Sequence, residues 1–347
     1  DKILEGAFTT RYKDVDILPP GSFFKINLKN LEINRARWWK GINSIPDINL
    51  NYSKAIDKTK ELLYSATRIR LVSDVKISTS LSGGIDSSTI FAILNNIENN
   101  KIVDLNPFIF KDKNIAYEQA IDLARYYNKK PIIIEKTDYK PEDFFLKIAA
   151  IEIPSTYFNQ LEIYKKQKEN GFKVSIDGHG ADECLGGYDK DIKNFSFDYL
   201  NAIADTYSAL ISMSDNSVKK NGQLNKKPKH YNIDIKNLFY SDENYSKIIN
   251  EYREYVDSNK INLISDNFIE DLKDLKNFNL GFQFLYHEAN YGHMQWLLNK
   301  WDKASMASSV EIRSPFLDWK FFQYALSLPS EFKIRNGKNK SILRDSF

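Results

Sequence analysis

The chain has 347 residues, 42% of them hydrophobic and 14% aromatic, which is typical of a globular protein with about two domains, or one domain and a helical extension. Its charged residues sum to a net charge of only +3, so no broad electrostatic attraction for nucleic acid is expected. The single cysteine, Cys184, excludes an internal disulfide and a site built from several thiols.

Neither a run of about 20 apolar residues nor a leader-like start is visible, so we predict a soluble, cytoplasmic protein without a membrane contact. The chain begins at Asp1 rather than at a methionine, and it stops soon after the start of a basic helix. We therefore expect it to be a fragment with both ends cut.

The first 40 residues read as short alternating stretches, among which Phe23–Leu28 is the clearest strand. The stretch ends at Trp38 and Trp39 and is typical of the last hairpin of a preceding domain.

From residue 52 onward, helical and strand patterns alternate. Strands are predicted over residues 75–81, 107–110, 131–134 and 172–176, and helices over residues 52–70, 90–97, 116–127, 141–151 and 159–169. Such alternation predicts an α/β fold with a mainly parallel, five-stranded type of sheet and helices on both faces. After residue 188 the pattern is helical, except for a polar stretch at residues 214–229 that we interpret as a solvated loop.

A glycine-rich turn, SGGIDSS at residues 82–88, lies between a predicted strand and a predicted helix. Paired glycines allow a tight turn whose amides face an anion, and the following helix adds its positive N-terminal end. Asp86 would repel a phosphate, so its presence in such a cradle implies a Mg²⁺ between carboxylate and phosphate. The turn is not of the Walker type, because no Gly-Lys-Ser/Thr follows at the required distance.

Three ordered motifs carry a family resemblance. The strand, SGGIDSS and helix resemble the PP-loop of ATP pyrophosphatases, which cleave ATP to AMP and pyrophosphate. The segment DGHGADECLGGY at residues 177–188 resembles an asparagine-synthetase motif, and residues 301–318 are similar to that family's downstream signature. With residues 340–344, the resemblance covers roughly residues 50–347, so the fold is identified as a PP-loop ATP pyrophosphatase sheet with helical elaborations.

The resemblance implies roles for individual residues. Asp86 and Asp182 would hold Mg²⁺ on the pyrophosphate, and Lys303 would stabilise charge on the phosphates during transfer, roles that suit hard cations and an ammonium group. ATP would be bound by Leu81, Ser82, Gly83, Gly84, Asp86, Ser87, Ser88 and Gly178.

Two positions depart from the family pattern. His179 stands where asparagine synthetases carry a glutamate thought to assist acyl transfer, and where the related β-lactam synthetases carry tyrosine. Its imidazole could be the catalytic base or could simply hydrogen-bond within the turn. Asp177 replaces the usual serine, and both changes weaken the expectation that free asparagine is the product.

Residues 1–40 resemble the tail of the glutaminase domain that precedes the synthetase domain, here placed at residues 50–347 and expected to be truncated at its C-terminus. The N-terminal cysteine nucleophile of that domain is absent, and Cys184 is a poor substitute because it lies inside the second loop motif. Ammonia would come from glutamine through the missing part of that domain, or else from solution. The resemblance leaves a homodimer open.

The predicted activity is that of a carbon–nitrogen ligase that adenylates a carboxylate, aspartate by default, and then transfers it to ammonia or another amine. The rivals are a ligase for another carboxylate such as a sugar acid or peptide, and a non-catalytic nucleotide-binding relative. A PP-loop enzyme of tRNA modification is disfavoured by the single cysteine and the low net charge.

Overall fold

The structure is a computed structural model that describes residues 15, 18, 20–97, 104–112, 114–135, 159–188, 271, 274–275, 278–290 and 293–347. The predicted helix at residues 141–151 and the predicted loop at residues 214–229 lie outside these ranges. No helix among the described residues is long and apolar enough to cross a membrane.

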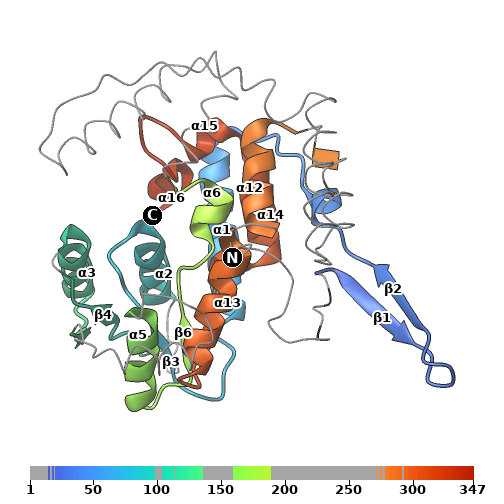
Figure 1. Cartoon of the computed structure of the whole chain (residues 1–347). Coiled ribbons are helices and arrows are strands. Elements are labelled where there is room, and N and C mark those ends of the chain that lie inside the picture. The colour runs from blue at the N-terminus through green and yellow to red at the C-terminus, as the bar shows by residue number, and fades with distance from the viewer. Residues whose placement is uncertain are drawn as a thin grey trace, which may run out of the picture.

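An antiparallel hairpin opens the described chain. Strand β1 (Ser22–Ile26) pairs with β2 (Ile33–Arg37), which confirms the strand predicted near residue 23. The hairpin projects away from the body of the molecule (Figure 1) and exposes apolar side chains along both strands. Its base is fixed by Arg37, whose guanidinium donates to both carboxylate oxygens of the buried Asp271 at 2.8 and 3.0 Å.

The body is built on parallel strands. One sheet has the order β3 (Ile77–Thr79), β6 (Val174–Ile176), β7 (Glu311–Arg313), and a second pairs β4 (Phe108–Phe110) with β5 (Ile132–Ile134). A parallel bridge from Ser80 to Phe108 joins the two, giving the overall order β5-β4-β3-β6-β7. The predicted parallel sheet is confirmed. Its fifth strand, β7, was not located in the sequence, because three residues with only one apolar side chain form no recognisable pattern.

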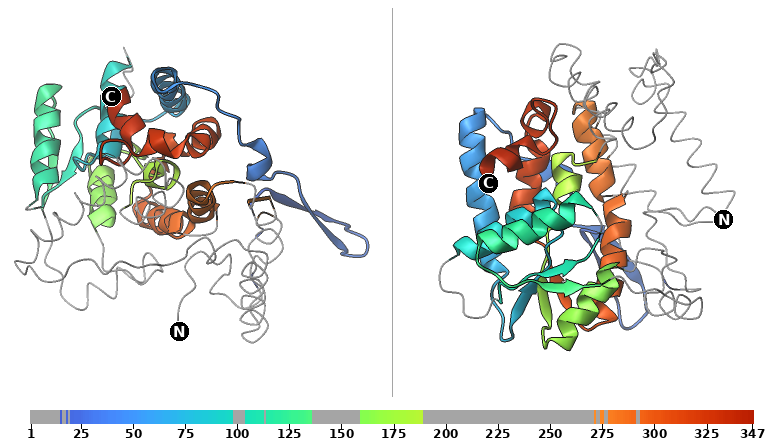
Figure 2. Two further views of the ribbon diagram at one scale, coloured as in Figure 1. Left: turned by 90° about the horizontal axis from the view of Figure 1, so that it is seen from above. Right: turned by 90° about the vertical axis from the view of Figure 1, so that its left-hand side faces the viewer.

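Helices cover one face of this sheet. Those around the main core are α1 (Tyr52–Ile69), α2 (Ile85–Asn96), α6 (Ala181–Leu185), α12 (Leu280–Asn290), α14 (Trp319–Ser327), α15 (Ser330–Lys333) and α16 (Ser341–Ser346), with short 3-10 turns η1 (Gly41–Ser44) and η2 (Pro315–Leu317). Helix α3 (Ile115–Tyr126) packs in a separate cluster with Leu81, Phe91 and Ile109. Two of the long helices begin at an asparagine cap: Asn51 accepts from the Lys54 amide, and Asn114 from the Tyr117 amide. Figure 2 shows these helices beside the strands from two further directions.

The opposite face is covered by α5 (Asn159–Glu169) and α13 (His293–Met306). Leu161 and Tyr164 of α5 form a buried cluster with Ala304 of α13 and with Val310. Helices therefore lie on both faces, as predicted, and the predicted helix at residues 159–169 is confirmed by α5.

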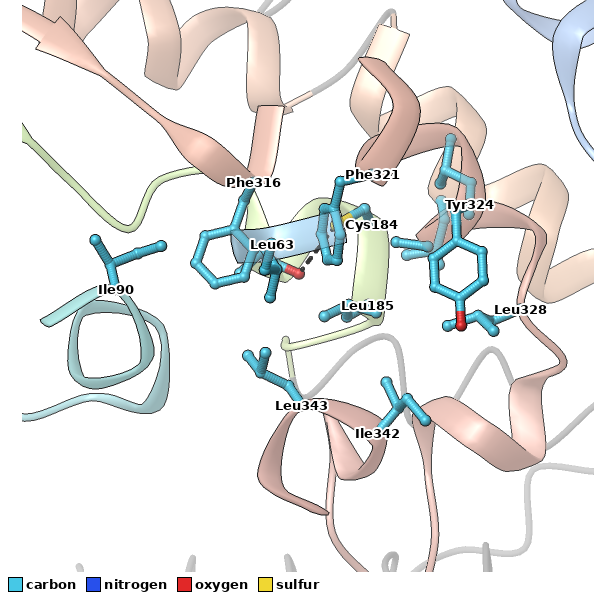
Figure 3. Packing of buried hydrophobic residues seen from close by; sticks show 14 of the residues in the cluster. Leu63, Ile90, Cys184, Leu185, Phe316, Phe321, Tyr324, Leu328, Ile342 and Leu343 are labelled. Atoms are coloured by element: carbon cyan, nitrogen blue, oxygen red, sulfur yellow. Dashed lines mark hydrogen bonds between the residues drawn. The ribbon is translucent and has the colours of Figure 1, made fainter. Parts of the chain in front are cut away.

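The C-terminal segment is part of the main core (Figure 3). Ile342 and Leu343 of α16 are fully buried in one cluster with Leu63, Leu185 and Phe316. Burial of each such side chain stabilises the fold by roughly 1.5–3 kcal/mol. This packing fixes the position of the residue that precedes α16, which is Lys340.

Candidate active site

Two loops meet at one edge of the sheet. The loop from β3 to α2 follows one strand, and the loop from β6 to α6 follows its parallel neighbour, so both lie at the carboxyl ends of the strands. They are in direct contact: a Cβ on Gly178 would lie 2.8 Å from both the carbonyl carbon of Asp86 and the amide nitrogen of Ser87. Only glycine allows this approach, so the two loops lie against each other at this edge of the sheet.

The first loop has the geometry of an anion cradle. Gly83 has a φ of +81°, and a Cβ there would lie 1.8 Å from the carbonyl oxygen of Ala116. The hydroxyls of Ser82 and Ser87 lie 2.9 Å apart, and Ser87 also accepts from the Ser82 amide at 3.1 Å. Helix α2 begins directly after Gly84, so its first amides lack partners within the helix and face the loop.

Lys340 joins the two loops. Its ammonium nitrogen lies 2.6 Å and 2.7 Å from the carboxylate oxygens of Asp86 and 2.5 Å from Oδ1 of Asp182. The lysine side chain is only 4% exposed. Its backbone has a left-handed φ of +50°, which costs about 1–2 kcal/mol in a residue other than glycine and is typical of functional sites.

Gly187 leaves the space that this contact needs. A Cβ at residue 187 would lie 1.7 Å from Oδ1 of Asp182 and 2.1 Å from Cε of Lys340. The carbonyl of Gly187 also accepts from the Asn339 side chain at 2.7 Å, which ties the second loop to the segment before α16.

The electrostatics of the cluster follow from this geometry. Burial raises the pKa of Asp86 to about 6, Lys340 opposes the rise, and the neighbouring Asp182 adds to it. Burial alone would lower the pKa of Lys340, but the two carboxylates outweigh it and raise that pKa. Lys340 is therefore a charged ammonium held by two acidic groups.

The residues present fit a Mg²⁺–ATP complex. Two carboxylates that can share one ammonium are close enough to share one divalent cation, and carboxylate oxygens are the ligands that Mg²⁺ prefers. No group of three or more His, Cys, Asp or Glu with metal-site geometry occurs among the described residues. That is usual for Mg²⁺ in nucleotide sites, where one or two carboxylates act together with phosphate oxygens and water.

His179 lies beside this cluster and lines a separate cavity. Its ring stacks on Trp301 with centroids 3.7 Å apart and an interplanar angle of 16°. The cavity has a volume of about 410 Å³, and its lining includes Arg70, His179, Trp301, Arg313, Ser314 and Leu317. It has room for a small polar substrate next to the loop of the second motif.

The predicted site residues are thus placed as follows. Asp86 and Asp182 share Lys340, and Gly178 touches the loop of Asp86, while Leu81 is buried beneath that loop at 1% exposure. Lys303 lies near the C-terminal end of α13, and its role toward phosphate stays a prediction.

Lys340 was not predicted as a site residue. In the sequence it is only the first residue of the segment 340–344 that shares the family resemblance, and its partner Asp86 is 254 positions away in the chain. A lysine directly before a short helix was the only local signal.

Comparison with known proteins identifies the family of this chain. The family model for asparagine synthase matches residues 58–347. The chain belongs to the asparagine synthase family.

Relatives within this family are distant. Asparagine synthetase (glutamine-hydrolyzing) 1 of Bacillus subtilis is 26% identical over 371 aligned positions, which cover 94% of this chain and 51% of that protein. Asparagine synthetase (glutamine-hydrolyzing) 3 of the same organism is 24% identical, covering 85% and 46%. The amidase chry2 of Gibberella zeae is 25% identical, covering 81% and 47%. The chain spans about half the length of the curated relatives that it matches.

Among solved structures, a U34-tRNA thiolase, NcsA from Methanococcus maripaludis with its [4Fe-4S] cluster, aligns with a TM-score of 0.30 and 14% identity, covering 75% of this chain and 82% of that one. This likeness is too weak to bear on the function of the asparagine synthase domain described here.

Proposed function

We propose that the protein is an ATP-dependent amide-forming ligase, which adenylates a carboxylate and then transfers the acyl group to ammonia or another amine. The observation that carries the proposal is the contact of Lys340 with Asp86 and Asp182 at the mouth of the glycine-rich loop. Three charged groups at the N-terminal end of α2 are suited to a polyphosphate with its metal.

Each group has a role in this scheme. The first amides of α2 and the hydroxyls of Ser82 and Ser87 would hold the phosphates. Asp86 and Asp182 would hold Mg²⁺, and the bound cation would neutralise the charge of the pyrophosphate. Lys340, together with Lys303 of α13, would stabilise the charge that grows on the departing pyrophosphate.

Aspartate is the default acceptor and ammonia the default amine, because several relatives are named as glutamine-hydrolyzing asparagine synthetases. We extend the proposal to the domains: residues 1–40 belong with a glutaminase unit, and residues 50–347 form the ATP-binding unit. The exposed hairpin of β1 and β2 supports this division, since it packs little of its apolar surface against the body.

A second candidate is a ligase for another carboxylate, such as a sugar acid or a peptide. His179 and Asp177 favour it, because both differ from the family pattern and His179 lines the cavity of about 410 Å³. The homologous amidase chry2 shows that names other than asparagine synthetase occur among the relatives.

The experiment is carboxylate-dependent pyrophosphate release from Mg-ATP by the whole protein, with aspartate and a panel of sugar acids and peptides as acceptors. We expect release with one acceptor, and its loss in Asp86→Asn. Asp57→Asn, an exposed carboxylate on α1, is the matched control and should keep full activity. Silence of the wild-type protein with every acceptor would overturn the proposal.

A further inference from the structure

A buried carboxylate stands directly behind the imidazole of His179. Asp177 is 3% exposed. Its Oδ1 accepts from the Ser175 hydroxyl at 2.7 Å, and its Oδ2 accepts from the Tyr164 hydroxyl at 2.8 Å. The Asp177 side chain is therefore fixed on both oxygens by groups from β6 and α5.

This carboxylate stays ionised in the interior. Burial would raise the pKa of Asp177, but the neighbouring His179 and the hydroxyls of Ser175 and Tyr164 outweigh burial and lower it. The arrangement continues inward, because Gln167 donates to the Ser175 hydroxyl at 3.0 Å and to the Ser80 hydroxyl at 3.2 Å. The Asp177 carboxylate is therefore held in place by a network of hydrogen bonds that reaches from β6 to α5.

The orientation of His179 is set by the same groups. Its Nε2 lies 3.6 Å from Oδ2 of Asp177 and 3.4 Å from the Tyr164 hydroxyl. Stacking on Trp301 fixes the plane of the ring. At 3.6 Å the contact with Asp177 is electrostatic rather than a full hydrogen bond, and such contacts often tighten when substrate binds.

We propose that Asp177 is a positioning residue that holds the neutral His179 imidazole with its proton on Nε2, so that Nδ1 is free to act as the general base toward the attacking amine. An anion facing one ring nitrogen favours the proton on that nitrogen and leaves the lone pair on the other. The inference rests on the proposed function and deepens it, because it assigns a base to the amine-transfer step.

The step balances without any further reactant. The amine nitrogen forms a bond to the acyl carbon of the adenylate. The bond from that carbon to the AMP oxygen breaks, and AMP leaves with the bonding electron pair. The surplus proton on nitrogen moves to Nδ1 of His179. The resulting imidazolium is stabilised by the charge of Asp177 and by the face of Trp301.

The first test reads the tautomer directly, independently of activity. The ring nitrogens of ¹⁵N-histidine-labelled protein distinguish the two neutral tautomers, and His179→Gln identifies the signals among the 4 histidines of this chain. We expect the Nε2–H form in the wild type and a shift toward the Nδ1–H form in Asp177→Asn. A wild-type Nδ1–H tautomer, or an unchanged ratio in the variant, would overturn the inference.

The second test separates the two half-reactions. Asparagine keeps the shape of Asp177: one hydroxyl can still donate to its amide oxygen, and the other can rotate to accept from its amide nitrogen. Asp177→Asn should keep pyrophosphate exchange into ATP within about twofold, and slow amide formation about 10²-fold, the lower end of the effect of a general base. Hydroxylamine, an amine that is largely unprotonated near neutral pH, should restore most of the transfer rate, which it would not do for a misfolded site.

The matched control is Asp271→Asn, a fully buried carboxylate that accepts from the Tyr286 hydroxyl at 3.0 Å but lies at the base of the hairpin. Once normalised to folded protein, it should leave the ratio of the two half-reactions unchanged. Wild-type transfer by Asp177→Asn, or equal loss of both half-reactions without rescue by hydroxylamine, would overturn the inference. Absence of pyrophosphate release in the wild type would instead overturn the proposed function, and the tautomer measurement would still decide on Asp177.

Discussion

The ammonium of Lys340 lies 2.6 Å from the carboxylate of Asp86, although the two residues are 254 positions apart in the chain. Asp86 lies in the first turn of α2, and Lys340 directly precedes α16, whose Ile342 and Leu343 are buried in the main core. The glycine-rich loop therefore meets Lys340 only when the C-terminal segment is docked, so we expect nucleotide binding to depend on the packing of α16.

Replacement of Lys340 by methionine tests this dependence. The change leaves Asp86 and Asp182 side by side without their cation, so we expect the free energy of unfolding to fall by about 3 kcal/mol, the lower end for a broken buried pair, because both carboxylates remain partly exposed. The rise in melting temperature caused by Mg-ATP should also be lost. Lys338→Met, two residues away and exposed, should change neither quantity, and an unaltered Mg-ATP response in Lys340→Met would remove Lys340 from the site.

Gly187→Ala probes the room around the same contact without removing a charge. The added methyl would lie 1.7 Å from Oδ1 of Asp182 and 2.1 Å from Cε of Lys340, so one of the two must move. We expect affinity for Mg-ATP, measured by titration calorimetry, to fall by about 10-fold or more, as for other changes that displace metal-binding groups.

Gly171→Ala is the control for Gly187→Ala. A Cβ on Gly171 would have no other atom within 4 Å, and the residue has a left-handed φ of +84°. Alanine there should cost about 1–2 kcal/mol of stability through backbone strain alone and leave Mg-ATP affinity unchanged. Equal losses of affinity in the two variants would show that the effect of Gly187→Ala is a general loss of stability.

Much of the sheet could be predicted, because β4 and β5 are short apolar runs and β3 and β6 lie in stretches where apolar and polar residues alternate before a glycine turn. The sheet edge that β3 and β6 share brings the two glycine loops together. The contact of Lys340 with Asp86 could not be predicted, because neither the left-handed backbone of Lys340 nor its distant partner leaves a local pattern in the sequence. Tyr164 shows the same limit: a helical pattern places it on α5, but only the packed structure turns its hydroxyl toward Asp177.

Cys184 should be unreactive in the native protein. Its side chain is fully buried in the main core, and burial, with Glu183 adding to it, raises the pKa of the thiol well above its usual value, so little thiolate forms at neutral pH. We expect iodoacetamide to label the peptide that carries Cys184 only after denaturation, as measured by mass spectrometry. Asp57→Cys, which places a thiol on the exposed side of α1, should be labelled at once; rapid native labelling of Cys184 would contradict the packing of Figure 3.

The pH dependence of stability should carry the signature of Asp177. Because its pKa is lowered from 3.8 in the folded state, the native protein binds fewer protons there than the unfolded chain does as the pH falls through this region. The stabilisation by ionised Asp177 is therefore fully present above pH 3.8 and is lost as the pH falls through the lower, folded-state pKa. Near neutral pH, Asp177→Asn should lower the free energy of unfolding by about 2 kcal/mol, since two hydroxyls lose a charged acceptor.

Urea unfolding of the wild type and Asp177→Asn between neutral pH and about pH 3 measures this difference in stability. The dependence of the unfolding free energy on urea concentration should be the same for both proteins, which checks that they expose the same surface on unfolding. The gap between the two proteins should narrow as the pH falls below 3.8, because the wild-type carboxylate then begins to bind its proton in the folded protein. Asp57→Asn, exposed on α1, should differ from the wild type by less than about 0.5 kcal/mol throughout. A gap that widens as the pH falls below 3.8 would mean that the pKa of Asp177 is not lowered in the folded protein, and would contradict the ionised carboxylate beside His179.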